Sequence, residues 1–214
     1  MTDRFTPGTM TDRSQRSAIC WLRILIPIAL LALQGCSGLT TRPATSGQAF
    51  AHNRELSHWQ LSGKIGIRSP RGADSAYLNW LQCGERYQIR INGPLGSGAV
   101  KLLGEPGLVT LLNGGEPTIV AASPEQLLME QFGWQLPLSQ LVYWVRGIPA
   151  PQQPWGPEPL GFEQDGWQLS FPSQTEQQHY QLPAKAVAQQ QQQELKVILI
   201  VKEWQLLPDC EGLQ

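Results

Sequence analysis

From residue 59 onward, hydrophobic positions alternate with polar ones along much of the chain. In 59–68 the apolar residues and Gly63 occupy every second position. This two-residue period predicts a half-buried strand. Similar runs predict strands over 75–81, 87–92, 99–103, 108–112, 118–121, 161–163, 167–171, 178–182 and 194–206. Because turn signals follow one another every eight to twelve residues or so, we expect an antiparallel meander.

Helical signals appear at three places. Residues 123–126, Ser-Pro-Glu-Gln, combine an N-cap serine, a proline at the first helical position and a capping box, and Gly133 is a stop signal. Residues 137–146 carry apolar side chains on one helical face, with Gly147 as the C-cap. A shorter helix is expected over 48–57.

Two segments without a clear period are expected to lie outside regular structure. Residues 148–161 are rich in proline and predict an irregular surface segment. Residues 188–193 hold five glutamines and predict an extended hairpin loop before the closing strand. A polyglutamine interaction segment is the alternative, but a run of five residues is too short to favour it.

The N-terminus has the pattern of a cleaved export signal. Arginines at 13, 16 and 23 precede an apolar run over 24–33, and Leu-Gln-Gly-Cys follows, ending at Cys36. The run is too short to span a bilayer, which takes about 20 residues, and it is typical of a signal peptide. The last four residues resemble the bacterial lipobox, so we predict acyl attachment at Cys36. An ordinary secretory signal with a coincidental cysteine is the alternative.

These signals divide the chain into four predicted parts. They are a lipoprotein signal peptide (1–35), a lipidated N-terminus with a small, polar, flexible tether (36–47), the folded domain (48–207) and a C-terminal tail (208–214). The tetrapeptide Met-Thr-Asp-Arg occurs at 1–4 and again at 10–13, so translation starts at Met1 or Met10. Either start leaves the parts after the signal unchanged.

Charge excludes one class of partner. The chain has 16 basic and 17 acidic residues, and removal of residues 1–35 takes away four basic and two acidic ones, leaving a net charge of −3. A mildly acidic domain without a Lys/Arg cluster is a poor nucleic-acid binder, because affinity there depends on neutralising phosphates. Eight tryptophans indicate large apolar surfaces to bury or an apolar ligand to hold.

Cys83 and Cys210 are the cysteines left once the signal is cleaved and Cys36 is acylated. An oxidising compartment would allow them to pair. However, Cys83 lies at a predicted hairpin turn and Cys210 in the tail, and nothing in the sequence places their Cα atoms within the ~7 Å that a disulfide requires. We favour unpaired thiols and leave the alternative open.

Motifs for enzyme chemistry are absent from the sequence. It contains no Gly-x-Ser-x-Gly elbow, His-Glu-x-x-His motif, P-loop or dinucleotide fingerprint. His52, His58 and His179 lack a spacing suited to a metal site. We therefore expect no catalytic residues, no cofactor and no metal.

Two stretches resemble a known family. Asn-Gly-Pro-Leu-Gly-Ser at 92–97 connects two predicted strands, and Pro-Leu-Ser-Gln-Leu at 137–141 continues through Trp144 to Gly-Ile-Pro at 147–149. In this order, at these spacings and behind a lipobox, they resemble the outer-membrane lipoprotein receptor family LolB. The resemblance runs from about Trp59 to Trp204. The glutamine run, the two thiols and the C-terminal tail depart from the family pattern.

The resemblance implies a mainly β fold with some α, an incomplete antiparallel β-barrel whose apolar cavity is covered by a helical lid. It implies a monomer, lipid-anchored to the outer membrane and facing the periplasm. Such a protein accepts client lipoproteins from the periplasmic carrier LolA and inserts them into the inner leaflet of the outer membrane. Exposing each acyl CH₂ to water costs ~0.8 kcal/mol, so clients must pass between dry pockets.

The two-residue and helical periods supply candidates for the cavity wall. The candidates are Leu61, Ile65, Ile67, Leu78, Trp80, Ile89 and Ile91 on the strands, with Leu127, Leu128, Leu141 and Val145 on the lid. The periods alone are equally compatible with a filled core, so an open cavity follows only from the resemblance.

Leu95 stands between Pro94 and Gly96 in a loop of small residues. The resemblance implies that it projects from the domain and serves membrane insertion of the client. A leucine folded back onto the barrel edge is the alternative. A second functional class also stays open, namely a scaffolding lipoprotein that binds an envelope protein partner; a scaffold would fill its barrel, whereas a carrier would leave it open. A hydrolase is a more distant third.

Overall fold

The computed structural model describes residues 46–93, 98–133 and 135–213. They belong to one compact unit, Ala44–Gln214. The helices are α2 (Ser46–Glu55), α3 (Pro124–Phe132), α4 (Leu138–Trp144) and the short 3₁₀ helix η3 (Glu211–Leu213). The strands are β1 (His58–Ser69), β2 (Gly72–Cys83), β3 (Arg86–Asn92), β4 (Val100–Glu105), β5 (Leu108–Asn113), β6 (Ile119–Ala121), β7 (Trp155–Glu158), β8 (Gly161–Gln164), β9 (Trp167–Gln177), β10 (Tyr180–Gln190) and β11 (Leu195–Leu206).

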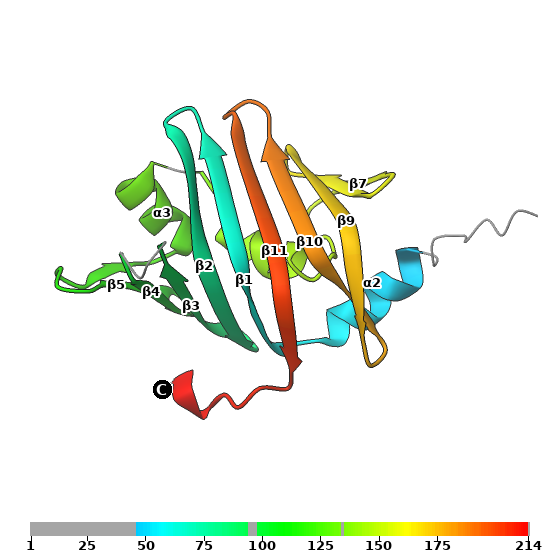
Figure 1. The fold of residues 1–214 in the computed structure, drawn as a ribbon, viewed down its shortest axis with the longest axis horizontal. Coiled ribbons are helices and arrows are strands. Elements are labelled where there is room, and N and C mark those ends of the chain that lie inside the picture. The colour runs from blue at the N-terminus through cyan, green and yellow to red at the C-terminus, as the bar shows by residue number, and fades with distance from the viewer. Residues whose placement is uncertain (1–45, 94–97, 134, 214) are drawn as a thin grey trace, which may run out of the picture. The chain divides into compact units, whose positions relative to one another are not determined.

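The described strands form one antiparallel sheet in the order β6-β5-β4-β3-β2-β1-β11-β10-β9-β8-β7 (Figure 1). It consists of two meanders, β1–β6 and β7–β11, joined where the first and last strands pair side by side. The predicted antiparallel meander is confirmed. The strand periods alone do not reveal the seam, because β1 and β11 lie far apart in the sequence.

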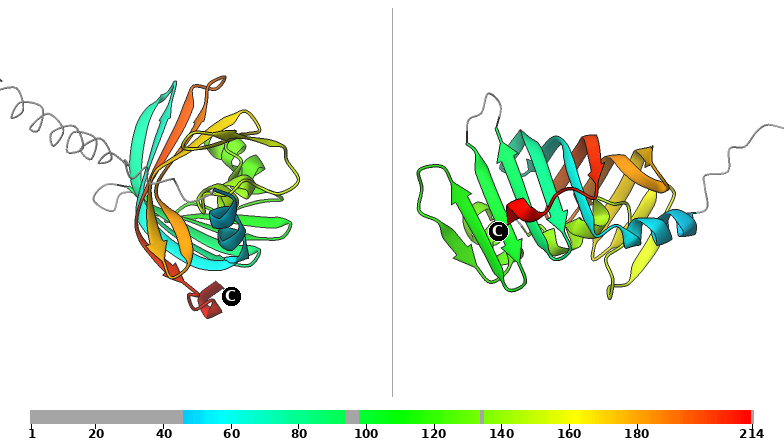
Figure 2. Two further views of the ribbon diagram at one scale, coloured as in Figure 1. Left: turned by 90° about the vertical axis from the view of Figure 1, so that its right-hand side faces the viewer. Right: turned by 90° about the horizontal axis from the view of Figure 1, so that it is seen from below.

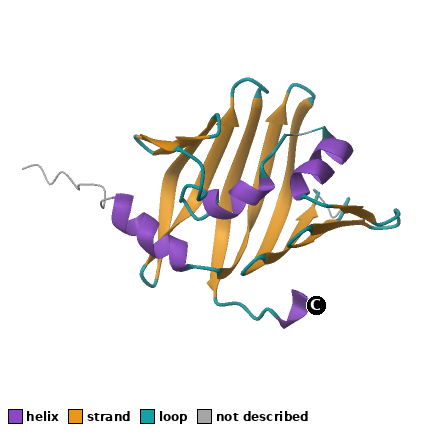
Figure 3. Cartoon of the chain, turned by 180° about the vertical axis from the view of Figure 1, so that it is seen from behind, coloured by secondary structure: helices purple, strands orange, loops and turns teal. Residues whose placement is uncertain are grey.

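The sheet curls around the helices. Viewed end-on it is a half-closed trough, with the helices on its concave side (Figure 2). From behind, α2, α3 and α4 lie across the inner face of the strands (Figure 3). Strands β6 and β7 are the opposite edges of the sheet and do not pair with each other. The predicted fold class, an incomplete barrel covered by helices, is confirmed.

Alternation along the central strands builds the core. On β11, Leu195, Val197, Leu199 and Val201 are buried, and the residues between them are exposed or half-exposed. A bulge between Ser62 and Gly63 shifts the pairing of β1 with β11, which brings Trp204 back to the inner face. A side chain at Gly63 would overlap the carbonyl oxygen of Ile200, so glycine permits this close approach.

Helix α3 has the signals found in the sequence. The hydroxyl of Ser123 accepts a hydrogen bond from the backbone N–H of Gln126 at 3.2 Å. Gly133 ends the helix with φ 67°, in the left-handed region. The capping box is incomplete, because the Gln126 side chain donates to Glu130 at 2.9 Å and not back to the N-cap. Helix α2 begins and ends two residues earlier than predicted, and α4 is shorter than predicted at both ends.

The prediction of an irregular segment over 148–161 is wrong in part, because it contains β7. This edge strand tolerates Pro157, since a proline cannot donate a ladder hydrogen bond and one side of an edge strand needs none. Strands β9 and β10 are also longer than predicted. The predicted loop at 188–193 is displaced, because β10 continues to Gln190 and the turn follows it.

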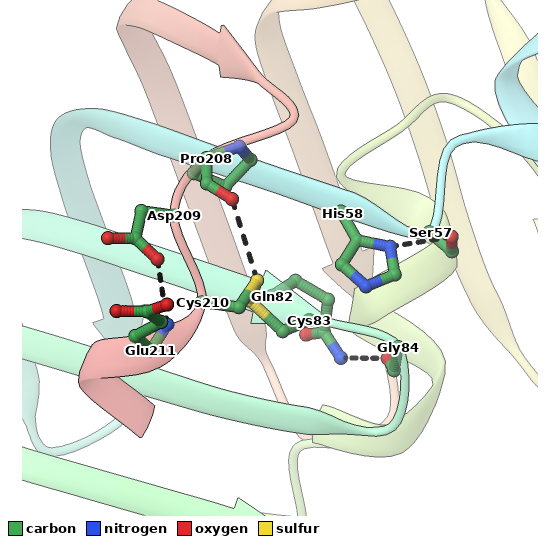
Figure 4. Close-up of a disulfide and its surroundings, with 9 residues drawn as sticks. All are labelled: Ser57, His58, Gln82, Cys83, Gly84, Pro208, Asp209, Cys210 and Glu211. Carbon is green, nitrogen blue, oxygen red and sulfur yellow. Dashed lines mark hydrogen bonds between the residues drawn. A yellow bond between two sulfur atoms is a disulfide. The ribbon is translucent and has the colours of Figure 1, made fainter. Parts of the chain in front are cut away.

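The expectation of unpaired thiols is wrong. Cys83 and Cys210 form a disulfide, with their Cα atoms 6.1 Å apart (Figure 4). After β11 ends, the tail crosses to the turn between β2 and β3, where Cys83 lies. The two cysteines are 127 residues apart in sequence, and only the pairing of the first and last strands places them together.

Candidate functional site

An apolar cavity of about 190 Å³ lies between α3 and the concave face of β1–β5. Its lining comes from both the sheet and the helix: Ile65, Ile67, Asp74, Ser75, Ala76, Ile91, Val100, Leu102, Leu111, Leu127 and Leu128. Asp74 and Ser75 are exposed at the end of the β1–β2 hairpin and border the mouth of the cavity. The other lining side chains are hydrocarbon, so the cavity suits an apolar ligand.

The helix over this cavity, α3, is short and amphipathic. Leu127 is completely buried, Leu128 is half-buried, and Met129 is 41 % exposed on the outer side. Among the side chains of α3 that the structure describes, Leu127 is the one that is completely buried, and Leu128 beside it lines the cavity. These described side chains lose little apolar contact when the helix moves away from the sheet.

A second, much smaller cavity of about 40 Å³ lies beneath α4. It shares Ile65 with the larger one, so the two are neighbours along the concave face. Its lining is Ile65, Leu78, Trp80, Leu141, Trp144, Val145, Leu169, Ala186, Val187, Ala188, Val197 and Leu199.

The predicted cavity residues divide into three groups. Ile65, Ile67, Ile91, Leu127 and Leu128 line the larger cavity. Ile65, Leu78, Trp80, Leu141 and Val145 line the smaller one. Leu61 and Ile89 are buried in the core and line neither. Cys36 and Leu95 lie outside the described residues.

Several lining residues were not among the candidates. Val100, Leu102 and Leu111 lie on β4 and β5, which pair with each other beside β3. The same two-residue period that selected Ile89 and Ile91 occurs there, and it could have found them. Trp144 was used as a family landmark, and its burial at 1 % exposure is the additional finding.

Helix α4 is fixed by a buried polar network. The indole Nε1 of Trp144 donates to Oε1 of Gln164 at 2.8 Å. The backbone N–H of Ala150 donates to the same oxygen, and Gln164 donates to the carbonyl oxygens of Ala150 and Gln153. The amide of Gln164 is 1 % exposed. One side chain thus joins α4 and the segment after it to β8.

A groove of about 530 Å³ opens at the opposite end of the strands, bordered by Trp59, Trp80, Tyr87 and Arg146 among others. Arg146 is 5 % exposed, and burial lowers the pKa of its guanidinium to about 10. Burial, followed by the charge of Glu125, raises the pKa of the Tyr87 hydroxyl above its usual range. At neutral pH both groups are therefore protonated.

Two features that the described residues lack belong to other functional classes. No group of three His, Cys, Asp or Glu side chains there lies close enough to hold a metal ion. Among the same residues, no helix is long and apolar enough to cross a membrane.

Comparison with known proteins decides the family. Residues 57–204 match the family described as outer membrane lipoprotein LolB. The LolB of Pseudomonas syringae pv. syringae is 44 % identical over 200 residues, which cover 86 % of this chain and 97 % of the relative. The LolB of Pseudomonas putida strain W619 is 46 % identical over the same shares. This chain belongs to the LolB family.

A solved structure has a similar fold. A LolA superfamily protein from Nitrosomonas europaea superposes with a TM-score of 0.53, at 9 % identity, over 79 % of this chain and 97 % of that one. The LolB fold described above is thus shared with the LolA superfamily. As a LolB family member, the protein is an outer-membrane lipoprotein with a role in lipoprotein localisation. The scaffolding alternative is not favoured.

Proposed function

We propose that this LolB protein accepts lipoproteins from the periplasmic carrier LolA into the cavity beneath α3, and inserts them into the inner leaflet of the outer membrane. It acts as a monomer and without a catalytic step. The observation that carries the proposal is the cavity of about 190 Å³. Its lining is almost entirely hydrocarbon, and the short helix α3 covers it.

The cavity is small for its proposed cargo. Pockets that enclose a drug-sized ligand measure roughly 300–1,000 Å³. A cavity of about 190 Å³ therefore admits only part of an acylated client. Admitting the rest of the acyl chains requires α3 to move outward. The limited burial of the described side chains of that helix makes the free-energy cost of this movement small.

Hydrophobic transfer explains why no energy source is required at this step. Each acyl CH₂ that stays buried avoids a cost of about 0.8 kcal/mol. Passage from the cavity of the carrier to this one, and then into the membrane, keeps the chains dry throughout. Transfer proceeds in one direction when the affinity for the acyl chains increases from the carrier to this protein and then to the membrane.

The decisive experiment uses the chain from residue 37 onward, which contains the compact unit 44–214 and its disulfide. A fluorescent lipoprotein bound to LolA is mixed with it, and transfer is followed by separating the two proteins. We expect stoichiometric transfer. A folded domain that accepts no lipoprotein and binds no apolar dye would favour the scaffolding function.

A matched pair of variants on α3 tests the cavity itself. Leu128→Glu places a charge in the lining, whereas Met129→Glu places it on the exposed side of the same helix. We expect Leu128→Glu to lose dye binding and client uptake, and Met129→Glu to retain both. Equal behaviour of the two variants would exclude this cavity as the acyl site.

The lipid anchor and the insertion loop belong to the same proposal. Cys36→Ala should abolish palmitate labelling of the mature protein. Ser37 follows the cysteine where an aspartate would signal inner-membrane retention in this family, so we expect outer-membrane residence. Appearance of the protein in inner-membrane fractions would contradict this.

Leu95→Glu should separate receipt from delivery. Burying a leucine in an apolar phase is worth about 1.5–3 kcal/mol, and a charge near hydrocarbon adds a penalty that depends on depth. We expect carrier-to-receptor transfer to continue while insertion into liposomes fails. If Leu95 packed against the barrel, melting temperature, uptake and insertion would fall together.

A further inference from the structure

The groove at the opposite end of the strands has charged and polar side chains within a largely apolar lining, whereas the lining of the cavity beneath α3 is almost entirely hydrocarbon. The ends of β1, β2 and β3, the turn between β4 and β5, and α4 enclose its volume of about 530 Å³. Trp80 borders both this groove and the smaller cavity beneath α4. Ile65 borders both apolar cavities. The concave face thus runs from a hydrocarbon-lined cavity at one end to a groove of mixed polarity at the other.

Two hydrogen-bond donors that border this groove have no acceptor among the described residues. Trp59 is completely buried, and its Nε1 is unpartnered. The hydroxyl of Tyr87 is also buried and unpartnered. Buried polar groups in proteins are nearly always hydrogen-bonded, so two orphaned groups beside one groove indicate a ligand that accepts hydrogen bonds.

The local packing holds the Tyr87 ring in place. Tyr87 on β3 pairs with Gly104 on β4, and a side chain at Gly104 would overlap the phenol ring. The ring therefore lies across the glycine. Because burial raises the pKa of this hydroxyl, the phenol keeps its proton and can donate.

Arg146 supplies further donors. Its Nε donates to the carbonyl oxygen of Val142 at 2.9 Å, and one terminal nitrogen donates to those of Asn53 at 3.2 Å and Leu56 at 2.6 Å. These bonds do not use all five N–H groups of a guanidinium. In the described part of the chain, the hydrogen bonds found for Arg146 go to backbone carbonyls and not to a carboxylate.

The charges around the groove do not favour an anion. Arg54 and Arg146 contribute two positive charges, Glu85 and Glu105 contribute two negative ones, and the negative charge of Glu125 also acts on Tyr87. A phosphate would meet at least as much repulsion as attraction, whereas a neutral group with strong acceptors would meet unsatisfied donors without a charge conflict. Ester carbonyls have this chemistry.

We propose that this groove binds the ester carbonyls of a diacylglyceryl group whose acyl chains extend past Trp80 towards the apolar cavities. The inference rests on the proposed function and adds the polar half of the same ligand. Client lipoproteins and membrane phospholipids both carry diacylglyceryl esters, so either can supply the group.

The test compares two lipids that differ only in their carbonyls. Dioctanoylglycerol and its diether analogue are titrated, below their aggregation limits, into the chain from residue 37 onward, with tryptophan fluorescence as the signal. We expect the ester to bind roughly three- to tenfold more tightly, as for loss of about one hydrogen bond. Equal affinities would overturn the inference while leaving the proposed function intact. Failure of both lipids to bind would instead count against the proposed function.

Tyr87→Phe removes only the hydroxyl donor. We expect it to reduce the ester preference by roughly threefold or more without changing affinity for the diether. Tyr77→Phe is the matched control, because Tyr77 is 48 % exposed and its ring contacts Lys64 and Lys202 outside the groove. An unchanged ester preference in Tyr87→Phe would exclude that hydroxyl and overturn the assignment.

Competition then identifies the source of the ester. A synthetic diacylglyceryl-cysteine peptide and dioctanoyl phosphatidylethanolamine are compared as competitors of the bound ester. Stronger competition by the peptide assigns the groove to clients, and stronger competition by the phospholipid assigns it to the membrane. If dioctanoyl phosphatidic acid exceeds both and its advantage falls with salt, the groove is an anion site and the neutral-ester proposal is wrong.

Discussion

Two of the helices on the concave face, α4 and α3, are held in opposite ways. Helix α4 and the residues after it are buried continuously from Trp144 to Ala150, and Gln164 fastens them to β8 with four hydrogen bonds. Helix α3 buries Leu127 completely and otherwise presents half-buried or exposed side chains where these are described. Helix α4 is thus a fixed wall of the trough, and helix α3 is the cover over the larger cavity.

The cavities differ accordingly. The space beneath the fixed helix is about 40 Å³, whereas the space beneath the cover is about 190 Å³. A ligand that needs room can gain it by displacing α3 at small cost, but not by displacing α4. Similar hydrophobic sequences therefore fill a core in one half of the trough and line an open cavity in the other.

Helix α2 strengthens the fixed half. The side chain of Asn53 donates to the carbonyl oxygens of Arg146 and Gln181, at 2.8 and 2.7 Å. Arg146 donates in return to carbonyl oxygens at the end of α2 and just beyond it, where a helix presents unsatisfied acceptors. The reciprocal bonds join α2, α4 and β10, and α3 takes no part in them.

The largest expected effect comes from breaking the fixed half at Gln164. Gln164→Met preserves volume but leaves the Trp144 indole and both backbone groups of Ala150 without their partner. Each of these three buried groups left unpaired costs about 1–3 kcal/mol, so we expect a loss of at least about 3 kcal/mol in urea unfolding. Dye binding beneath α3 should persist while the protein is folded.

Gln174→Met is the control, because Gln174 is exposed on β9. A small effect there together with a large one at Gln164 would assign the loss to the buried network. If Gln164→Met were as stable as the control, α4 would not be fixed in the way described.

Removal of the disulfide should have the next largest effect. The bond joins Cys83 and Cys210, which are 127 positions apart in the sequence, and disulfides typically contribute about 2–4 kcal/mol, with longer closed loops at the upper end. It attaches the tail after β11 to the β2–β3 turn, in the half that lacks the Gln164 network. We expect the double variant Cys83→Ala, Cys210→Ala to unfold at lower urea concentration by a corresponding amount.

Reduction of the wild-type protein is the matched comparison. It should reproduce the double variant, and the reductant should not change the variant further. Client uptake by the folded variant should remain, because neither cysteine lines the apolar cavity beneath α3. Unchanged stability after reduction would show that the attachment of the tail to the β2–β3 turn does not stabilise the fold.

Local patterns in the sequence predicted local structure well. The alternation of 59–68 predicted β1, and the signals at Ser123 and Gly133 predicted the bounds of α3, because both depend on near neighbours. The disulfide was missed because it depends on the pairing of β1 with β11, a contact between the two ends of the domain. Strand β7 was missed because prolines mask an edge strand.

The site divides in the same way. Which residues face inward is set by the strand period, and Ile65, Ile67 and Ile91 were found by it. Whether they enclose space or fill it depends on how far α3 stands from the sheet, which no local pattern encodes. Leu61 and Ile89 show this, since they have the same period as Ile65 but are packed in the core.

The smallest expected effect tests a hydrogen bond that joins α3 to α4. The N-cap position of α4, Pro137, offers no side-chain cap. Glu125 of α3 instead accepts a hydrogen bond from the backbone N–H of Ser139 at 2.8 Å, and so caps α4 from the neighbouring helix. This bond holds the cover against the fixed wall. Glu125→Asp keeps the negative charge in the first turn of α3 but shortens the side chain by one methylene group, which takes it out of reach.

We expect Glu125→Asp to lose about 1 kcal/mol of stability and to admit an apolar dye roughly two- to tenfold faster, because opening α3 no longer breaks that bond. Glu130→Asp is the control on the same helix, since it makes the same chemical change at an exposed position whose hydrogen bond goes to Gln126 within α3. Stopped-flow dye entry distinguishes them. Faster entry in Glu125→Asp alone identifies α3 as the moving cover, whereas equal rates in both variants would mean that the cavity opens by another route.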